Sequence, residues 1–516
     1  MKQILHILRK DLRHYWPEAL AALAALCAYV WFQIRTWNRP LESWPGITGR
    51  YLEGATDLLL PLAWWFLVIR IIQGETSVGD RQFWVTRPYE WEKLLAAKVI
   101  FVLLTVNVPF FFMQAALLAY EGFNPIHHLP GLLWLQLFPL FLTLPVAALA
   151  TVTSSLVRTV LAILAVVLYL IAGAVLSSEI PSSSFSSETD SLQAILFLAT
   201  CVFVILWQYS KRRTNQSRLA IVALAAIIVL ILVATPYRKL VARSYPLLQP
   251  PDTQLQFALL PPPKSSGSED LPDRDEKVTV ALPLSVSGVK EQSILKIRGV
   301  LLEIEASNGR RWDSGWTSLY QTLFSNRHRV VVSLEIPKKE YDAIKSGIVN
   351  GSLSLAMETL RDTEVQRFVA AEGEFALPGA PFCSANWGFA REIHCRAPLR
   401  DPYWLLTTDT SESTCPLGED ESRPKAGTLA HAWVGSPGSE TPDFDFNPVR
   451  FFDFSAWSDE DSGGTERDPG ICAGTPFTLS KPQPERRFQE ELEFKQLAID
   501  DYRTRMGRFT FGRIRR

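Results

Sequence analysis

The sequence predicts an α-helical polytopic membrane domain of about seven transmembrane helices, followed by a mainly β, sandwich-like extracytoplasmic domain. Three observations predict this architecture: long apolar runs confined to the first 240 of 516 residues, a change of hydrophobic period after residue 277, and opposite charge in the two halves. Residues 1–240 contain 19 Lys and Arg against 13 Asp and Glu, a net charge of +6, whereas the remainder contains 33 against 40, a net charge of −7. The composition therefore indicates two domains in different surroundings.

Residues 1–16 predict an amphipathic interfacial helix. Four cations are interleaved with Ile and Leu there: Lys2, Arg9, Lys10 and Arg13. This spacing fits a helix that lies on membrane lipids with its cations toward the headgroups, and it fits a cleaved signal peptide poorly. The chain is expected to turn near Pro17 into the first span.

Residues 17–240 predict the transmembrane domain. Most of its apolar runs reach the roughly 20 residues that a helix needs to cross about 30 Å of hydrocarbon. Buried helices of a soluble protein would show polar faces that interrupt these runs, and no such faces are present. The second run is short and contains Arg70. A re-entrant segment within 131–177, in place of two full spans, is an alternative. The runs are 17–35, 57–73, 94–120, 131–152, 156–177, 192–209 and 219–235.

Lys and Arg near the membrane predict the orientation, because they favour cytoplasmic segments. With the N-terminus in the cytoplasm, thirteen of these cations fall inside and six outside. Seven spans then place the region after residue 240 on the extracytoplasmic side of a cell (inner or plasma) membrane.

The cysteines agree with this assignment. Cys27 and Cys201 lie within predicted spans, and four more lie in the second half: Cys383, Cys395, Cys415 and Cys472. An oxidising compartment permits two disulfides among these four. Three pairings are possible, of which Cys383 with Cys395 and Cys415 with Cys472 joins nearest neighbours; four free thiols, or a metal site without a clear spacing motif, are the alternatives.

The second half begins with a linker, 241–277, that is rich in Pro and polar residues, and continues as a soluble β-rich domain, 278–516. Alternating apolar residues predict strands, and a mixed α and β domain is the alternative. Ser307–Gly309 and Asn350–Gly351 are expected to be turns, 401–480 long loops, and 486–506 a C-terminal helix. The predicted strands include 278–286, 300–304, 330–336 and 353–357.

No catalytic, metal or nucleotide site is evident in the sequence. There is no Gly-x-x-x-x-Gly-Lys-Ser/Thr phosphate loop. The acidic run Asp459–Gly464 lacks the distal Glu of a calcium loop, and the adjacent His127 and His128 are better explained as interfacial polar residues than as ligands of one metal. We therefore expect no cofactor in this chain and no nucleic-acid partner.

Charges inside the predicted membrane region are few. Between residues 99 and 178 only Glu121 and Arg158 are charged, and both lie at span ends. Arg70 and Lys98 are expected to extend their side chains to the cytosolic surface. Ion-coupled carriers hold ions on ionisable groups within the membrane, so a self-powered secondary transporter is disfavoured.

The predicted inner loop 74–98 mixes charged and aromatic residues, with Pro88 placed to start a helix. This composition fits a docking surface for a cytosolic partner. It fits equally an interfacial turn in which Trp84, Tyr89 and Trp91 lie at headgroup depth.

The loop, especially Phe83-Trp84-Val85-Thr86-Arg87-Pro88 followed by Leu94-Leu95-Ala96-Ala97-Lys98, resembles the permease subunits of type-two ATP-binding-cassette (ABC) exporters. Residues 1–16 resemble their elbow helix, and 154–158 resembles their short inner turn; the likeness covers about the first 235 residues. A seventh span and the large C-terminal domain depart from the family's pattern. The resemblance implies that this loop forms the surface on which a separate ATPase subunit docks. The implied coupling-loop residues are Glu75, Asp80, Trp84, Arg87 and Pro88.

The resemblance implies a permease of an ABC-type exporter that is not itself an enzyme. It implies a separate ATPase subunit that binds ATP and Mg, a second permease copy or paralogue, and membrane lipids as partners. A membrane-anchored receptor or scaffold that binds through the outer domain is the alternative. A membrane enzyme fits less well, because Asp57, Glu121 and Glu179 are scattered in the sequence.

Overall fold

The computed structural model describes most of the helices and strands of the chain. The described ranges are 2–37, 47–74, 90–179, 187–234, 237–247, 255–262, 277–290, 293–307, 309–324, 329–345, 347–369, 373–377, 380–386, 392–399, 404–409, 429–434, 446–454, 457–458 and 474–503. The chain divides into two compact units. Unit 1 contains residues 1–172, 191–229 and 366–479, and unit 2 contains residues 173–190, 230–365 and 480–516.

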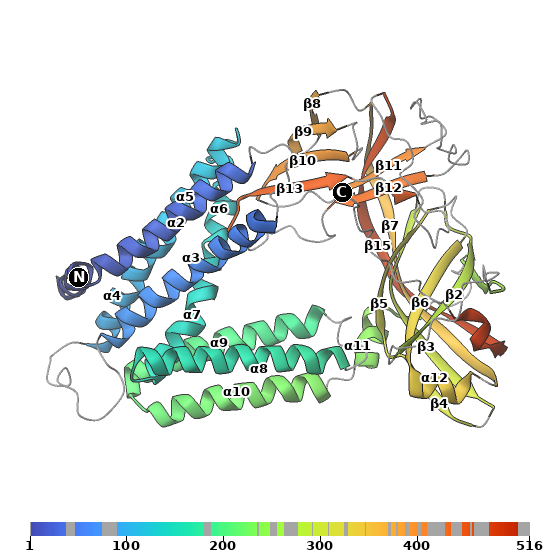
Figure 1. The fold of residues 1–516 in the computed structure, drawn as a ribbon, viewed down its shortest axis with the longest axis horizontal. Helices are drawn as coiled ribbons and strands as arrows, with labels where there is room; N and C mark the ends of the chain where they lie inside the picture. Colours follow the sequence, from blue (N-terminus) through green and yellow to red (C-terminus); the bar gives the residue numbers. More distant parts are fainter. Residues whose placement is uncertain are drawn as a thin grey trace. The chain divides into compact units, whose positions relative to one another are not determined.

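Helices form the first half of the chain, as predicted (Figure 1). Among the described residues, seven stretches are helical, long and apolar enough to cross a membrane. Two of them are composite: α4 continues through a π-helical turn, η3, into α5, and α6 continues into α7 at Gln136. The helices are α1 (Lys2–His14), α2 (Trp16–Trp37), α3 (Ile47–Gln73), α4 (Trp91–Val102), η3 (Leu103–Asn107), α5 (Val108–Tyr120), α6 (Leu129–Leu135), α7 (Leu137–Val152), α8 (Leu156–Glu179), α9 (Ser187–Lys211) and α10 (Thr214–Ala234).

The seven apolar stretches pack to different degrees. Between 28% and 39% of the residues are buried in the stretches of α2, α3, α4–α5 and α6–α7, but only 6% to 17% in those of α8, α9 and α10. The better-packed helices share a core in which Leu60, Leu67 and Phe101 are fully buried. The other three contact one another more sparsely; the hydroxyl of Tyr169 on α8, for example, donates to the carbonyl of Ala225 on α10.

Unit 1 also contains β structure from residues 366–479. One antiparallel sheet has the strand order β13-β10-β9-β8, and Figure 1 shows its strands side by side. Its strands are β8 (Gly373–Leu377), β9 (Ala380–Asn386), β10 (Glu392–Pro398) and β13 (Val449–Phe454). The other strands of the region are β11 (Trp404–Asp409), β12 (Leu429–Val434) and β14 (Trp457–Ser458), which pair in the order β11-β12-β14.

In its described residues, unit 2 is built from two sheets around a main hydrophobic core. β2 pairs with β1 and β6, and β3 pairs with β4, β5 and β7. Alternate residues of β2 and β6 are buried in the same core as residues of β3, β7 and β15. The strands are β1 (Gln256–Leu259), β2 (Lys277–Ser287), β3 (Ser293–Ala306), β4 (Arg311–Asp313), β5 (Thr317–Leu323), β6 (Arg329–Pro337), β7 (Ile348–Val369) and β15 (Pro476–Ala498). Short helices α11 (Tyr237–Ser244), α12 (Lys338–Ile344) and η6 (Ile499–Tyr502) accompany them.

The helix predicted over 486–506 is wrong, because this segment is mainly strand β15 followed by the single turn η6. Its many Glu and Gln residues favour a helix locally. However, Phe488, Leu492 and Phe494 recur at even spacing, and all three pack into the core of unit 2. Burial in the sheet therefore overrides local propensity.

Three other expectations also differ from the structure. Asn350 and Gly351 lie inside β7, and the glycine serves close packing, since a Cβ there would lie 2.1 Å from the carbonyl oxygen of Glu303. The predicted linker contains the end of α11 and strand β1. Strands β11 to β14 occupy parts of 401–480, which was expected to consist of loops. The predicted strands at 278–286, 300–304, 330–336 and 353–357 are confirmed.

Candidate functional site

The coupling-loop residues predicted from the sequence lie outside the described residues. These are Glu75, Asp80, Trp84, Arg87 and Pro88, all between Gly74 and Glu90. The structure does describe both ends of this segment, at the end of α3 and the start of α4. We call this end of the helices the loop end, and the opposite end, after α5, the sheet end.

At the loop end, α1 is fixed to α4 by a buried ion pair. The ammonium of Lys98 donates to Asp11 Oδ2 over 2.8 Å, and both side chains are almost fully buried. Ile7, Leu94 and Ala97 on the same two helices belong to one buried apolar cluster. Lys98 was expected to reach the membrane surface. Instead, Asp11 provides a partner from the neighbouring helix, so Lys98 links the amphipathic helix to the helix that follows the loop.

The end of α3 is held by hydrogen bonds from three directions. Arg70 donates to Glu18 at the start of α2 over 3.3 Å. The amide of Gln73 donates to the hydroxyl of Thr159 on α8 over 2.6 Å and to that of Thr153, in the α7–α8 turn, over 3.3 Å. Both ends of the loop are thus anchored to other helices, and a force on the loop would reach α1, α2, α7 and α8.

At the sheet end, a second ion pair joins α5 to the β13-β10-β9-β8 sheet. The Arg396 guanidinium on β10 donates to Glu121, which follows α5, and the Glu121 side chain is only 4% exposed. Arg396 also lies over the ring of Phe382, 5.4 Å from its centroid. Glu121 lies at the end of a span-like helix, as expected, and it also accepts a hydrogen bond from an arginine 275 positions later in the chain.

Apolar contacts surround this ion pair. Leu118 and Leu132 of the helices share a cluster with Leu399 and Val449 of the sheet region. Leu399 has a φ of +68°, a left-handed conformation that costs a leucine roughly 1 kcal/mol. Gly122 has a φ of +85° and lies against Phe382, where a Cβ would come within 3.1 Å of the ring. A strained residue and a required glycine are therefore both found where the sheet meets the helices.

Phe446, just before β13, packs within the helices. Its ring lies among four aromatic side chains from α2, α3, α5 and α7, which we call the aromatic box. The distances between ring centroids are 5.8 Å to Tyr29, 5.8 Å to Trp64, 6.2 Å to Phe110 and 4.9 Å to Phe138. A segment far away in the sequence thus supplies one residue to the core of the best-packed helices.

The structure contains one of the two predicted disulfides. Cys383 on β9 and Cys395 on β10 are bonded and directly opposite each other in the sheet. Cys415 and Cys472 lie outside the described residues, so their pairing stays a prediction. Cys27 and Cys201 are free, as expected. The disulfide cross-links the two strands that carry Phe382 and Arg396.

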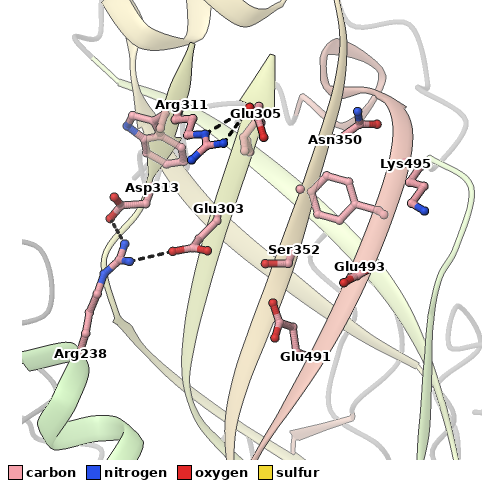
Figure 2. Close-up of a pocket in the computed structure, with 14 residues that line it drawn as sticks. Arg238, Glu303, Glu305, Arg311, Asp313, Asn350, Ser352, Glu491, Glu493 and Lys495 are labelled. Atoms are coloured by element: carbon pink, nitrogen blue, oxygen red, sulfur yellow. Dashed lines mark hydrogen bonds and ion pairs between the residues drawn. The ribbon is translucent and has the colours of Figure 1, made fainter. Parts of the chain in front are cut away.

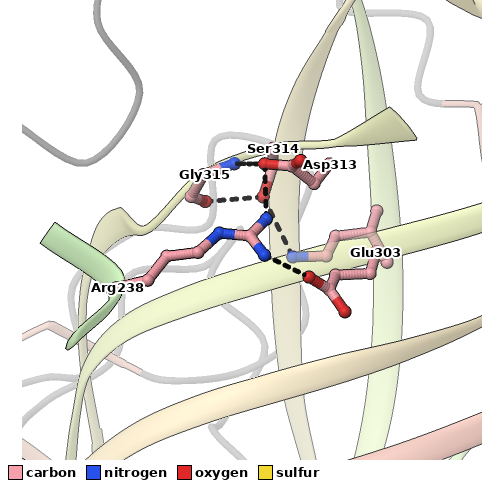
Figure 3. Close-up of polar contacts among 6 residues, drawn as sticks. Arg238, Glu303, Asp313, Ser314 and Gly315 are labelled. Atoms are coloured by element: carbon pink, nitrogen blue, oxygen red, sulfur yellow. Dashed lines mark hydrogen bonds and ion pairs between the residues drawn. The ribbon is translucent and has the colours of Figure 1, made fainter. Parts of the chain in front are cut away.

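Unit 2 has a pocket of its own, beside the helix that follows the last span (Figure 2). Its volume is about 640 Å³, and its polar lining comes from α11, β3, β4, β7 and β15. Figure 3 shows Arg238 of α11 between Glu303 and Asp313. The distance from nitrogen to oxygen is 2.8 Å in each of these two ion pairs. Burial disfavours the charged form of Arg238, but hydrogen bonds and Coulomb attraction to these two carboxylates together outweigh it and raise the pKa of Arg238. α11 is also anchored by Val241 and Tyr245, which pack on the sheet.

A charge cluster around the buried Glu358, on β3, β7 and β15, lies elsewhere in unit 2. Burial favours the neutral acid at Glu358, but hydrogen bonds and Coulomb attraction from Arg298 and Arg487 outweigh it and lower the pKa of this carboxyl. Burial, and then the charge of Arg298, lower the pKa of Lys296 to about 8. Within the described residues, no three His, Cys, Asp or Glu side chains come together as a metal site.

Sequence reasoning missed the residues that join the elements. Asp11 did carry a signal, since it is the lone acid in a basic amphipathic segment. Arg396 and Phe446 carried none, because their partners are hundreds of residues away and their local surroundings are ordinary. Asp57 and Glu121, considered for a membrane enzyme, are not brought together with any described acid or His cluster.

Comparisons with known proteins do not identify a family. No protein-family model matches the chain. No curated protein matches it either. Among solved structures, red sea bream transglutaminase is similar with a TM-score of 0.13 and 9% identity, over 49% of this chain and 30% of that one. The chain thus spans less than a third of that protein's length, and a likeness this weak carries no argument about fold or function.

Proposed function

We propose that the chain is the membrane permease subunit of an ABC-type exporter, energised by a separate ATP-binding subunit that docks on the loop 74–98. The observation that carries this proposal is the anchoring of both ends of that loop. Gln73 is tied to α7 and α8, and Lys98 is tied to α1 through a buried ion pair. Movement of a docked ATPase would therefore be passed to several helices at once.

The same proposal assigns the two sides of the membrane. The loop end is cytoplasmic, as the distribution of Lys and Arg predicts, and the sheet end is extracytoplasmic. The Cys383–Cys395 disulfide supports this assignment, since disulfides persist in oxidising compartments. The sparsely packed α8, α9 and α10 leave apolar surface for lipid and for a second permease copy or paralogue.

A continuous helical path connects the two ends. It runs from Lys98 on α4 through the π-helical turn η3 and α5 to Glu121, which holds Arg396 of the sheet. π-helical turns are frequent at functional sites because they interrupt the regular hydrogen-bond ladder. We assign this path the role of transmitting movement from the loop to the extracytoplasmic sheet.

Association with an ATPase tests the proposal. Tagged full-length chain in mild detergent should co-purify with a phosphate-loop ATPase, identified by mass spectrometry and by ATP hydrolysis in the purified complex. The double charge reversal Glu75→Arg with Arg87→Glu should remove it. Arg311→Glu, an exposed arginine of unit 2, is the matched control and should leave association intact. Unchanged association in the double variant would count against the loop assignment, and absence of any ATPase would count against the permease.

The second candidate is a membrane-anchored receptor or scaffold that binds a partner through the extracytoplasmic domain. The pocket of unit 2 favours it, because Arg238 on α11, the helix that follows the last predicted span in the sequence, lines this pocket. A receptor predicts that changes in 75–89 leave function intact and that removing 241–516 abolishes it. The permease predicts loss of function in both cases.

A further inference from the structure

Three amide side chains lie beside the aromatic box. Asn107 and Gln114 stand three positions before and four positions after Phe110, so all three share one face of the helix. Asn107 Nδ2 donates over 2.7 Å to the carbonyl of Gln136, the residue between α6 and α7. Gln136 Nε2 in turn donates over 3.1 Å to Gln114 Oε1. We call Asn107, Gln114 and Gln136 the amide cluster.

The amide cluster is incompletely satisfied. Asn107 Oδ1, Gln114 Nε2 and Gln136 Oε1 are buried and have no hydrogen-bond partner. Gln114 is fully buried and Asn107 is 6% exposed. An amide group without a partner costs about 1 to 3 kcal/mol in a protein interior, and hydrocarbon offers it no alternative partner. Three such atoms together indicate a place for a molecule that supplies both donors and an acceptor.

Two irregularities of the backbone meet at this place. The π-helical turn η3 ends at Asn107, and the chain of α6 and α7 is interrupted at Gln136. In transporters, interrupted membrane helices are found where they line a binding site. None of the seven side chains of the aromatic box and the amide cluster carries a charge. The chemistry of the site is therefore neutral, with an aromatic part and a hydrogen-bonding part.

We infer that the aromatic box and the amide cluster form one binding site for a neutral amphipathic molecule with an apolar ring or chain and a hydroxyl or amide head. The side chain of Phe446 occupies this site in the structure and blocks it. The phenyl ring of Phe446 shows directly that the box accepts an apolar group of this size. The statement that this molecule is the exported cargo rests on the proposed export function. The statement that the site binds it does not.

Movement of the β13-β10-β9-β8 sheet would withdraw Phe446 from the aromatic box. Phe446 lies three residues before Val449, where β13 begins and where the sheet contacts the helices. β13 pairs with β10 along its length, and β10 carries Arg396, the partner of Glu121. Separation of Arg396 from Glu121 would free the sheet to move, and Phe446 would leave the box with it.

Photolabelling tests the site without any ATPase. The probe is 4-(hydroxymethyl)benzophenone, a neutral photoreactive alcohol, applied to the full chain in phosphatidylcholine nanodiscs. In Phe446→Ala, adducts on peptides containing Trp64 and Phe110 should rise at least about fivefold over wild type and should be displaced by excess 4-benzylbenzyl alcohol. Gln114→Leu in the same background should lower them about fivefold, the loss expected for one hydrogen bond of about 1 kcal/mol.

Phe375→Ala is the matched control, because it makes the same truncation among packed aromatic residues of the sheet. It should leave labelling at the wild-type level. If Phe446→Ala does not purify as a monodisperse protein, Phe446→Leu should give an intermediate increase, and wild type should give the same displaceable adducts at higher probe concentration.

Three results would overturn the inference: equal labelling of wild type and Phe446→Ala, adducts that the competitor does not displace, or adducts that Gln114→Leu leaves unchanged. The second of these indicates simple partition into lipid. Failure of this experiment leaves the ATPase association untouched, and loss of ATPase association leaves the photolabelling untouched, so the two proposals fail separately.

Discussion

Helices α5 and α11 are joined to β structure in two different ways. In unit 1, Arg396 and Phe446 contact residues more than 270 positions away, and the contacts are buried: Glu121 is 4% exposed, and the box around Phe446 lies within the helix core. In unit 2, α11 packs on its sheet through Val241 and Tyr245, and Arg238, which pairs with Glu303 and Asp313, is 52% exposed. The first junction contains a buried ion pair, whereas the buried contacts of the second are apolar and its ion pairs are exposed.

The difference shows where a movable contact can be built. Exposed ion pairs such as Arg238 with Glu303 are worth about 1 kcal/mol or less, and the buried Val241 and Tyr245 hold α11 on the sheet without them. Apolar contacts also accompany Arg396 and Glu121, but Glu121 is buried, so separating the pair leaves an uncompensated charge at the junction. A junction that depends on one buried ion pair can open when that pair separates, which is the property that withdrawal of Phe446 requires.

The largest effect is expected where both partners are buried. Lys98→Met leaves Asp11 charged and without its ammonium partner in an apolar cluster, which costs about 3 to 5 kcal/mol. The thermal midpoint of the purified chain in nanodiscs should fall by several degrees. Adding Asp11→Asn should restore part of it, since no unpaired charge then remains. An unchanged midpoint in Lys98→Met would contradict the buried pair.

Arg396→Met tests the junction of unit 1 and should have the next largest effect. It leaves Glu121 buried without its cation, at a cost of about 2 to 3 kcal/mol, reduced because Arg396 itself is about one third exposed. Release of the sheet should also make proteolysis between β9 and β13 several-fold faster. If the cleavage rate equals that of wild type, Arg396 does not hold the sheet to the helices.

The lowered pKa of Lys296 predicts that the stability of unit 2 depends on pH. Its pKa in the folded chain, about 8, lies below the ordinary 10.5, so the unfolded chain binds more protons between these pH values and stability rises with pH across this window. After allowance for partial exposure, the gain is about 1 kcal/mol. Lys296→Met should remove that increment, measured as the difference between wild-type and variant thermal midpoints at pH 7.5 and pH 10. A constant difference would contradict the lowered pKa.

Arg238→Ala should have the smallest effect, less than about 1 kcal/mol, because both of its ion pairs are exposed. The thermal midpoint should change by no more than about 1 to 2 degrees. A change as large as that of Arg396→Met would remove the distinction between the two junctions.

Local patterns predicted the parts of this fold that local physics dictates. The apolar runs predicted the span-like helices, and alternation predicted strands β2, β3, β6 and β7. The prediction of a helix over 486–506 was wrong because burial of Phe488 and Phe494 between sheets outweighs the local helix propensity, and no local pattern reports that burial. The prediction of a turn at Asn350–Gly351 was wrong for a similar reason, since the glycine is needed for the close approach of Glu303 and Phe494.

The sequence by itself determined which segments are apolar enough to cross a membrane, where β structure begins, and that Cys383 and Cys395 are neighbours able to pair. Only the tertiary structure decided that Asp11 meets Lys98, that Arg396 meets Glu121, and that Phe446 enters the helix core. The physical reason is the distance along the sequence over which each interaction acts. Hydropathy and periodicity follow from neighbouring residues, whereas a buried charge or ring takes whichever partner the packing brings to it, and that partner can lie anywhere in the chain.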